Sequence, residues 1–119
     1  MAELHKIPEE NIFKTWEEMA KKEKFADAVI IGTQDQMHVE PTIAFADLKY
    51  HILLEKPIAI TKEGCEKIIS SIEKNQVLFS TGHVLRYTPM TQTVKKMVEE
   101  KVIGDILNIQ HLEPVIDRK

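Results

Sequence analysis

The stretch AVIIG (residues 28–32) decides how the rest of the sequence is interpreted. Four apolar residues in a row, closed by a glycine, are typical of a strand that is buried on both faces, as in a parallel sheet. The runs ILL (residues 52–54) and VLF (residues 77–79) predict two more such strands. The segments that join the three runs are too long for hairpins and long enough for helical crossovers. The sequence therefore predicts an α/β fold, with a parallel sheet and flanking helices.

Apolar residues spaced three and four apart predict helices between these strands. One such helix precedes the first strand and ends near Lys24, and another covers residues 41–48. Thr61 and Thr88 are expected to cap the N-termini of two more, the second with Pro89 in its first turn. The helix after Thr88 carries an apolar stripe that we expect to lie in a core, namely Met90, Val94, Met97 and Val98. Beyond Gly104, Leu107, Ile109 and His111 alternate with Ile106, Asn108 and Gln110, a pattern that predicts a strand with one buried face.

Composition excludes several classes of function. The 119 residues are 43% hydrophobic, which is enough to form a core, and the net charge of -3 is spread along the chain without a basic face for nucleic acid. No apolar run approaches the roughly 20 residues that span a bilayer. Cys65 is the single cysteine, and the five histidines do not have metal-ligand spacing. We therefore expect a cytoplasmic protein that binds no metal, membrane or nucleic acid.

Polar and ionisable residues follow the predicted strands at their carboxyl ends, where open parallel sheets bind ligands. Thr33 and His38 follow the first strand, and Glu55-Lys56-Pro57 follows the second. An ion pair between Glu55 and Lys56 could present an ammonium to a substrate oxygen, or could be a solvated pair before the proline that ends the strand. His38 is a candidate donor to a ribose or phosphate, or else a surface or capping histidine. Arg86, after the third strand, could clamp an anion or form a structural ion pair.

Four ordered motifs together resemble the Gfo/Idh/MocA oxidoreductases: ADAVIIGTQDQMH, YHILLEKPIAIT, VLFSTGHVLRYTP and GDILNIQHLEP. The similarity runs from about residue 11 to residue 115. It implies a Rossmann-like dinucleotide-binding domain followed by an α/β domain with an open sheet. It also implies hydride transfer between NAD or NADP and a hydroxyl or carbonyl carbon of a sugar or polyol.

The resemblance also implies roles for single residues. Thr33 and His38 match the loop that lines the cofactor, although Gln34 stands where the family usually has a proline. Glu55 and Lys56 match the pair beside the nicotinamide ring and the substrate, with Lys56 as the catalytic residue. Two further positions match cofactor-binding residues: Pro57, where the family's proline is commonly cis, and Arg86.

Two features of the family are missing from the sequence. No G-x-G-x-x-G turn is present to hold a pyrophosphate, and the family's later catalytic histidine is not reached. We therefore expect a truncated oxidoreductase, with a partial dinucleotide-binding domain over residues 1–104 and the start of a C-terminal substrate domain over residues 105–119. Cofactor binding is expected to be weak or absent, and the chain alone to be inactive. Two alternatives stay open: a non-enzymatic binding or regulatory module that pairs with a full-length relative through an exposed sheet edge, and a fragment without a stable function.

Overall fold

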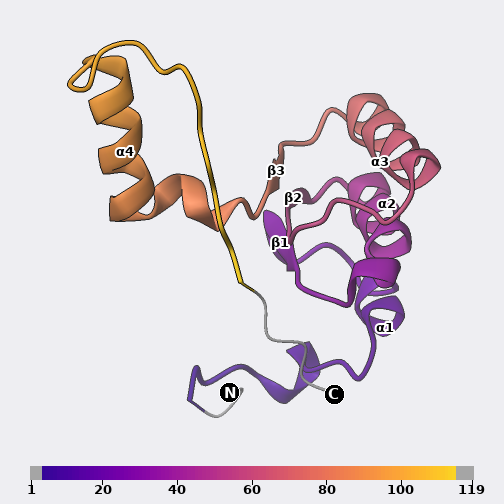
Figure 1. Ribbon diagram of the computed structural model, residues 1–119. Coiled ribbons are helices and arrows are strands. Elements are labelled where there is room, and N and C mark those ends of the chain that lie inside the picture. Colours follow the sequence, from indigo (N-terminus) through magenta and orange to yellow (C-terminus); the bar gives the residue numbers. More distant parts are fainter. Residues whose placement is uncertain (1–3, 115–119) are drawn as a thin grey trace. The chain divides into compact units, whose positions relative to one another are not determined.

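The computed structural model describes residues 4–114, which divide into two units, one up to His83 and one from Val84 onward. The elements of the first unit are as follows (Figure 1): η1 (Glu9–Asn11), α1 (Trp16–Ala20), β1 (Ala28–Ile31), η2 (Asp35–Met37), α2 (Val39–Asp47), β2 (His51–Leu54), α3 (Lys62–Asn75) and β3 (Phe79–Thr81). The second unit contains η3 (Val84–Tyr87) and α4 (Pro89–Glu99). The division falls earlier than residue 104, and the predicted domain boundary there stays a prediction.

The three strands form a parallel sheet in the order β1-β2-β3, as the sequence predicts. Ile52 of β2 pairs with Val29 of β1 on one side and with Phe79 of β3 on the other. The third strand begins two residues later than the run VLF indicates. The reason is that the backbone N–H of Ile52 donates to the Leu78 carbonyl at 2.8 Å, so the pairing starts at Phe79. The preceding Val77 is buried, and it contributes to the core rather than to the strand.

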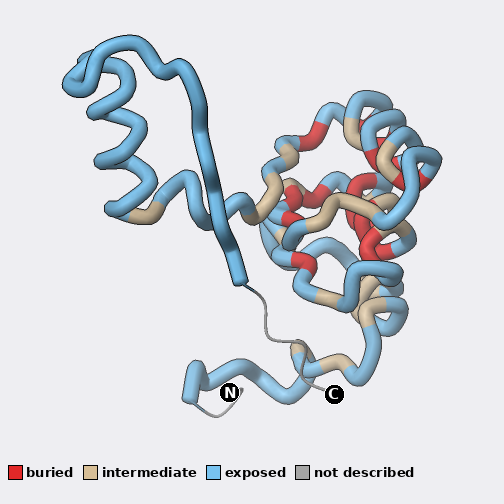
Figure 2. The backbone as a smooth tube through the Cα atoms, in the orientation of Figure 1, coloured by how far each residue is buried: buried red, intermediate tan, exposed pale blue. Residues whose placement is uncertain are grey.

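The core lies between the sheet and helices α2 and α3, which cover one face (Figure 2). Leu54 of β2, Phe45 and Ala46 of α2 and Ile68 of α3 are all buried there. The expectation that the strands are buried on both faces is wrong for the described residues. Successive residues of a strand project to opposite faces of the sheet, and Ile30 of β1 and its pairing partner Leu53 of β2 are 73% and 40% exposed. The helices of the first unit cover a single face, so apolar side chains on the other face stay exposed.

Helix α3 begins and ends through local chemistry. The Thr61 hydroxyl oxygen accepts the backbone N–H of Gly64 at 3.0 Å, which confirms the predicted N-cap. Gly64 must be small, because a Cβ there would lie 2.9 Å from Cβ of Ala59. At the other end the chain leaves the helix at Gln76, whose φ of 54° is left-handed.

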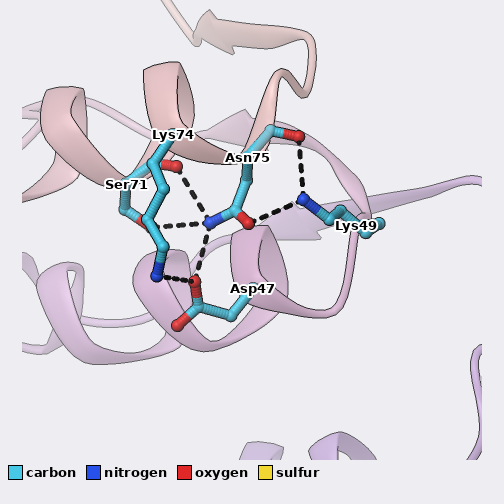
Figure 3. A network of polar contacts seen from close by, with 5 residues as sticks. All are labelled: Asp47, Lys49, Ser71, Lys74 and Asn75. Atoms are coloured by element: carbon cyan, nitrogen blue, oxygen red, sulfur yellow. Dashed lines mark hydrogen bonds and ion pairs between the residues drawn. The ribbon is translucent and has the colours of Figure 1, made fainter.

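A polar network joins the C-terminal ends of α2 and α3 (Figure 3). The side-chain amide of Asn75 donates to the Asp47 carboxylate at 2.7 Å, and the Lys49 ammonium donates to the Asn75 side-chain oxygen at 2.8 Å. Lys74 lies 3.5 Å from the same carboxylate. The hydrogen bond from Asn75 and the nearby lysines lower the pKa of Asp47 below its ordinary value, despite partial burial. The network fastens the two covering helices to each other.

The second unit differs from the sequence-based expectation in two ways. Helix α4 forms and is capped by Thr88, whose hydroxyl oxygen accepts the Thr91 N–H at 3.4 Å. However, its apolar stripe from Met90 to Val98 is exposed, and not part of a core. Residues 105–114 form neither helix nor strand, so the strand predicted there is absent from the described chain. A strand and an amphipathic helix each need a partner surface, and within this unit the described residues provide none. Residues 115–119 of the predicted second domain lie outside the described residues.

None of the helices within residues 4–114 is both long and apolar enough to cross a membrane.

Candidate functional site

The carboxyl ends of the three strands are tied together by their backbones. The N–H of Glu55, just after β2, donates to the Ile31 carbonyl at the end of β1 at 2.9 Å. The N–H of Gly82, just after β3, donates to the Leu54 carbonyl of β2 at 2.8 Å. The hydrogen bonding thus extends one residue beyond the strands. It fixes one edge of the sheet, at which Glu55, Lys56 and Gly82 lie.

His38 links two of the turns that leave this edge. Its side chain is fully buried at the start of α2. The ring atom Nδ1 lies 2.6 Å from the Pro57 carbonyl oxygen, and Nε2 lies 3.1 Å from the Thr33 carbonyl oxygen. Both carbonyls are acceptors, so a neutral ring can donate to one of them and a doubly protonated ring to both. His38 therefore joins the turn after β1 to the turn after β2, and its ring nitrogens face protein.

The turn after β1 is closed by its own hydrogen bonds. The Thr33 hydroxyl donates to the Met37 carbonyl at 3.2 Å, and the Met37 N–H donates to the Gln34 carbonyl at 2.7 Å. The turn therefore forms with Gln34 at the position where the family usually has a proline. Thr33 is half-buried, and its backbone carbonyl is held by His38.

Glu55 and Lys56 do not form the ion pair that the sequence suggests, at least among the described residues. The Glu55 carboxylate instead accepts the backbone N–H of Lys56 at 3.3 Å. Successive residues of an extended chain project to opposite sides, which separates two adjacent side chains. Both residues are exposed, and the Lys56–Pro57 peptide bond is cis, as the resemblance implies. The result is a carboxylate and an ammonium at the same strand end, each accessible to a ligand.

Gly82 is a member of this site to which the sequence alone gave no role. A Cβ built on Gly82 would lie 2.9 Å from Oε2 of Glu55, so the carboxylate rests where a side chain would otherwise be. The available signal was the glycine that directly follows a predicted strand, beside the strand that ends in Glu55. Close approach of another group is a common reason for glycine at such a position.

The structure brings five of the six predicted site residues to one sheet edge: Thr33, His38, Glu55, Lys56 and Pro57. Arg86 belongs to the second unit, where it lies exposed in η3, and its predicted cofactor contact stays a prediction. A separate groove of about 580 Å³ lies in the first unit beside α1 and the N-terminal ends of α2 and α3. Its lining includes Trp16, Glu40 and Lys67, and none of the six predicted site residues.

Comparison with known proteins identifies relatives for most of the chain. Residues 2–83 match the family described as "Oxidoreductase family, NAD-binding Rossmann fold". The chain is 36% identical over 85 residues to 2,7-anhydro-N-acetylneuraminate hydratase of Escherichia coli, covering 71% of this chain and 23% of that protein. It is 30% identical over 90 residues to myo-inositol 2-dehydrogenase of Thermotoga maritima, covering 74% of this chain and 27% of that protein.

Solved structures agree with the sequence comparison. The crystal structure of an NAD-binding protein from Listeria innocua superposes with a TM-score of 0.70 and 28% identity, covering 78% of this chain and 26% of that one. The chain spans about a quarter of the length of the curated relatives it matches. The match at 2–83 contains the sheet, its covering helices and the edge at which Glu55 and Lys56 lie. The chain therefore belongs to the Gfo/Idh/MocA family of oxidoreductases, with the NAD-binding Rossmann fold.

Proposed function

We propose that the carboxyl edge of the β1-β2-β3 sheet forms the nicotinamide side of a NAD(P) site in an oxidoreductase that acts on sugars or polyols. The observation that carries this proposal is the end of β2, where an exposed carboxylate and an exposed ammonium stand on consecutive residues of a backbone that is hydrogen-bonded to β1. The Glu55 carboxylate can accept hydrogen bonds from a ribose or an amide. The Lys56 ammonium can donate to a substrate oxygen.

The residues present fit the nicotinamide half of such a cofactor. Gly32, at the end of β1, has a φ outside the left-handed region, and a Cβ there would meet no atom within 4 Å. The fold itself therefore does not require a glycine at residue 32. A ligand that passes over the end of β1 would require a glycine there, because the ligand would occupy this open space.

The chemistry of each residue follows from its position. When bound, the cofactor would accept or supply the hydride. Lys56 would hold the substrate oxygen and exchange a proton with it, a contribution of about 10²–10⁴-fold in rate for a well-placed acid or base. Relatives are named for an anhydro sugar acid and for inositol, which supports a polyhydroxylated substrate. The free cysteine Cys65 fits a reducing compartment such as the cytoplasm.

The 119 residues alone are expected to bind the cofactor weakly and to show no turnover. They contain no G-x-G-x-x-G, the turn whose backbone N–H groups hold the pyrophosphate. Absorbance of the reduced nicotinamide, followed across a panel of sugars and polyols, tests this expectation. Turnover that Lys56→Ala abolishes would contradict it.

Saturation-transfer NMR with NAD tests the proposed site. Protein contact should give stronger signals for the nicotinamide protons than for the adenine protons. Lys56→Ala should reduce the nicotinamide signals, whereas Lys67→Ala, an exposed lysine of the separate groove, should leave them unchanged. Stronger signals from adenine than from nicotinamide would overturn the assignment of this edge.

One observation favours a second candidate function, a module that pairs with another chain. Strand β1 is an edge strand, since within residues 4–114 it pairs with β2 alone. Its exposed residues Ala28 and Ile30 offer an apolar surface next to unpaired backbone groups. Association with a second copy or with a full-length relative would cover them.

A further inference from the structure

We propose that His38 is a positioning residue that couples the turn after β1 to the turn after β2, so that both sides of the nicotinamide site keep one fixed relative position. The inference deepens the proposed function and rests on it. His38 itself is expected to make no contact with cofactor or substrate, because its ring is fully buried and both ring nitrogens face backbone carbonyls. This differs from the direct contact with ribose or phosphate that the sequence suggests.

The backbone of His38 is held in place by helix α2. The Thr42 hydroxyl donates to the His38 carbonyl at 2.6 Å, and the Thr42 N–H donates to the same oxygen at 3.3 Å. Thr42 is fully buried in α2, whose residues Phe45 and Ala46 lie in the core. The imidazole therefore projects from a fixed base. Any movement of either turn has to break a contact with it.

The two contacts join the turns beyond the last backbone hydrogen bond between β1 and β2, which runs from the Glu55 N–H to the Ile31 carbonyl. Thr33 follows the end of β1, whereas Pro57 follows Lys56 at the end of β2. Side-chain hydrogen bonds of the described residues give no other link between these two turns. A buried donor or acceptor without a partner costs about 1–3 kcal/mol. Without the ring nitrogens, the turns should therefore move so that the Thr33 and Pro57 carbonyls can accept hydrogen bonds from water. Lys56 then loses its fixed position relative to Thr33.

The two contacts differ in length, which predicts an order of strength. The contact of Nδ1 with the Pro57 carbonyl is the shorter one, at 2.6 Å. The 3.1 Å contact with the Thr33 carbonyl is longer. A side chain with a single donor group should therefore restore the Pro57 turn before the Thr33 turn.

The test compares three variants of the full 119-residue chain. His38→Phe keeps an aromatic ring and removes both nitrogens, and His38→Gln keeps a donor group. The matched control is His51→Phe, the same substitution at the amino end of β2, where Nδ1 of His51 accepts the Leu78 N–H at 3.1 Å. Amide chemical shifts and hydrogen exchange are measured for both turns, and affinity is measured for nicotinamide mononucleotide.

His38→Phe should change the amides of Thr33 and Lys56 together, speed their exchange and weaken nicotinamide mononucleotide binding about tenfold, a change of about 1.4 kcal/mol. His38→Gln should restore the Pro57 turn and part of the affinity, and it carries the test if the Phe variant does not melt cooperatively. His51→Phe should leave both turns and the affinity as in the wild type, even at an equal loss of melting temperature.

Two results would overturn the inference. One is a His38→Phe variant in which neither turn changes, or in which one turn changes alone. The other is a His51→Phe variant with the same loss of affinity and the same amide changes, which would reduce His38 to a general contributor to stability. If the wild-type chain binds no nicotinamide mononucleotide, the proposed function fails instead, and the joint change of the two turns still decides whether His38 couples them.

Discussion

The carboxylate of Glu55 occupies the space next to Gly82 in which a Cβ would lie, with 2.9 Å between that Cβ position and Oε2 of Glu55. The two residues directly follow neighbouring strands, and the Gly82 N–H donates to the carbonyl of Leu54, the residue immediately before Glu55. A glycine after β3 thus sets where the carboxylate after β2 can rest. This relationship makes Gly82 part of the site without any contact to a ligand.

Gly82→Ala should displace the Glu55 carboxylate and weaken nicotinamide contact, with little effect on stability. The group that must move is the end of an exposed, flexible side chain, so the free energy of unfolding should change by less than about 1 kcal/mol. Glu55→Ala should weaken nicotinamide contact to a similar extent. Because both variants act on the same carboxylate, the double variant should add nothing to Glu55→Ala. Additive effects of the two substitutions on affinity would show that Gly82 acts independently of Glu55.

Gly32→Ala should also lower affinity without lowering stability. Since a Cβ at Gly32 meets no atom within 4 Å, alanine should be tolerated or should stabilise the chain by about 0.4–1 kcal/mol. The same methyl group would stand in the space assigned to the cofactor, so affinity for nicotinamide mononucleotide should fall. Thermal melting and titration of one sample measure both quantities. Unchanged affinity would mean that the ligand does not pass over the end of β1.

The network around Asp47 should make stability depend on acid pH. Its pKa is lowered in the folded chain, first by the Asn75 hydrogen bond, so its contribution is present above the unfolded pKa and is lost as the pH falls through the folded one. Asp47→Asn removes this charge. We expect the variant to be less stable near pH 7 by less than about 1 kcal/mol, since the pair with Lys74 is half exposed. The difference should shrink below about pH 4, measured by urea unfolding.

The control for this prediction is Asp27→Asn, since Asp27 is exposed and lies outside the network. It should follow the wild type at both pH values. An Asp47→Asn variant whose pH dependence equals that of the wild type would contradict the role assigned to the Asp47 carboxylate.

The open face and edge of the sheet should favour self-association. Ile30 is 73% exposed on edge strand β1, so Ile30→Thr, which keeps a β-branched side chain, should lower the associated fraction in sedimentation experiments. Ile69→Thr removes an exposed isoleucine from α3 instead and should have little effect on association. A wild-type chain that stays monomeric at high concentration, with protected amides along β1, would show that this edge does not mediate association.

Local patterns predicted the elements of this fold well. The run AVIIG predicted β1, and Thr61 and Thr88 cap their helices as predicted. Both features depend mainly on residues that are close in sequence. The exposure of Met90 on α4 could not be predicted, because a helical stripe specifies a face and not its partner. The same limit applies to the site. The position of His38 before a helix was evident, but its contact with the Pro57 carbonyl depends on how two crossovers pack in space.

Amide shift mapping with nicotinamide mononucleotide tests the central claim most directly. The account predicts saturable shifts at Gly32, Thr33, Glu55, Lys56 and Gly82, suppressed in Lys56→Gln and retained in Lys67→Gln. Shifts confined to the groove around Trp16 and Lys67, or retained in full after Lys56→Gln, would contradict the assignment of the nicotinamide site to the carboxyl edge of the sheet.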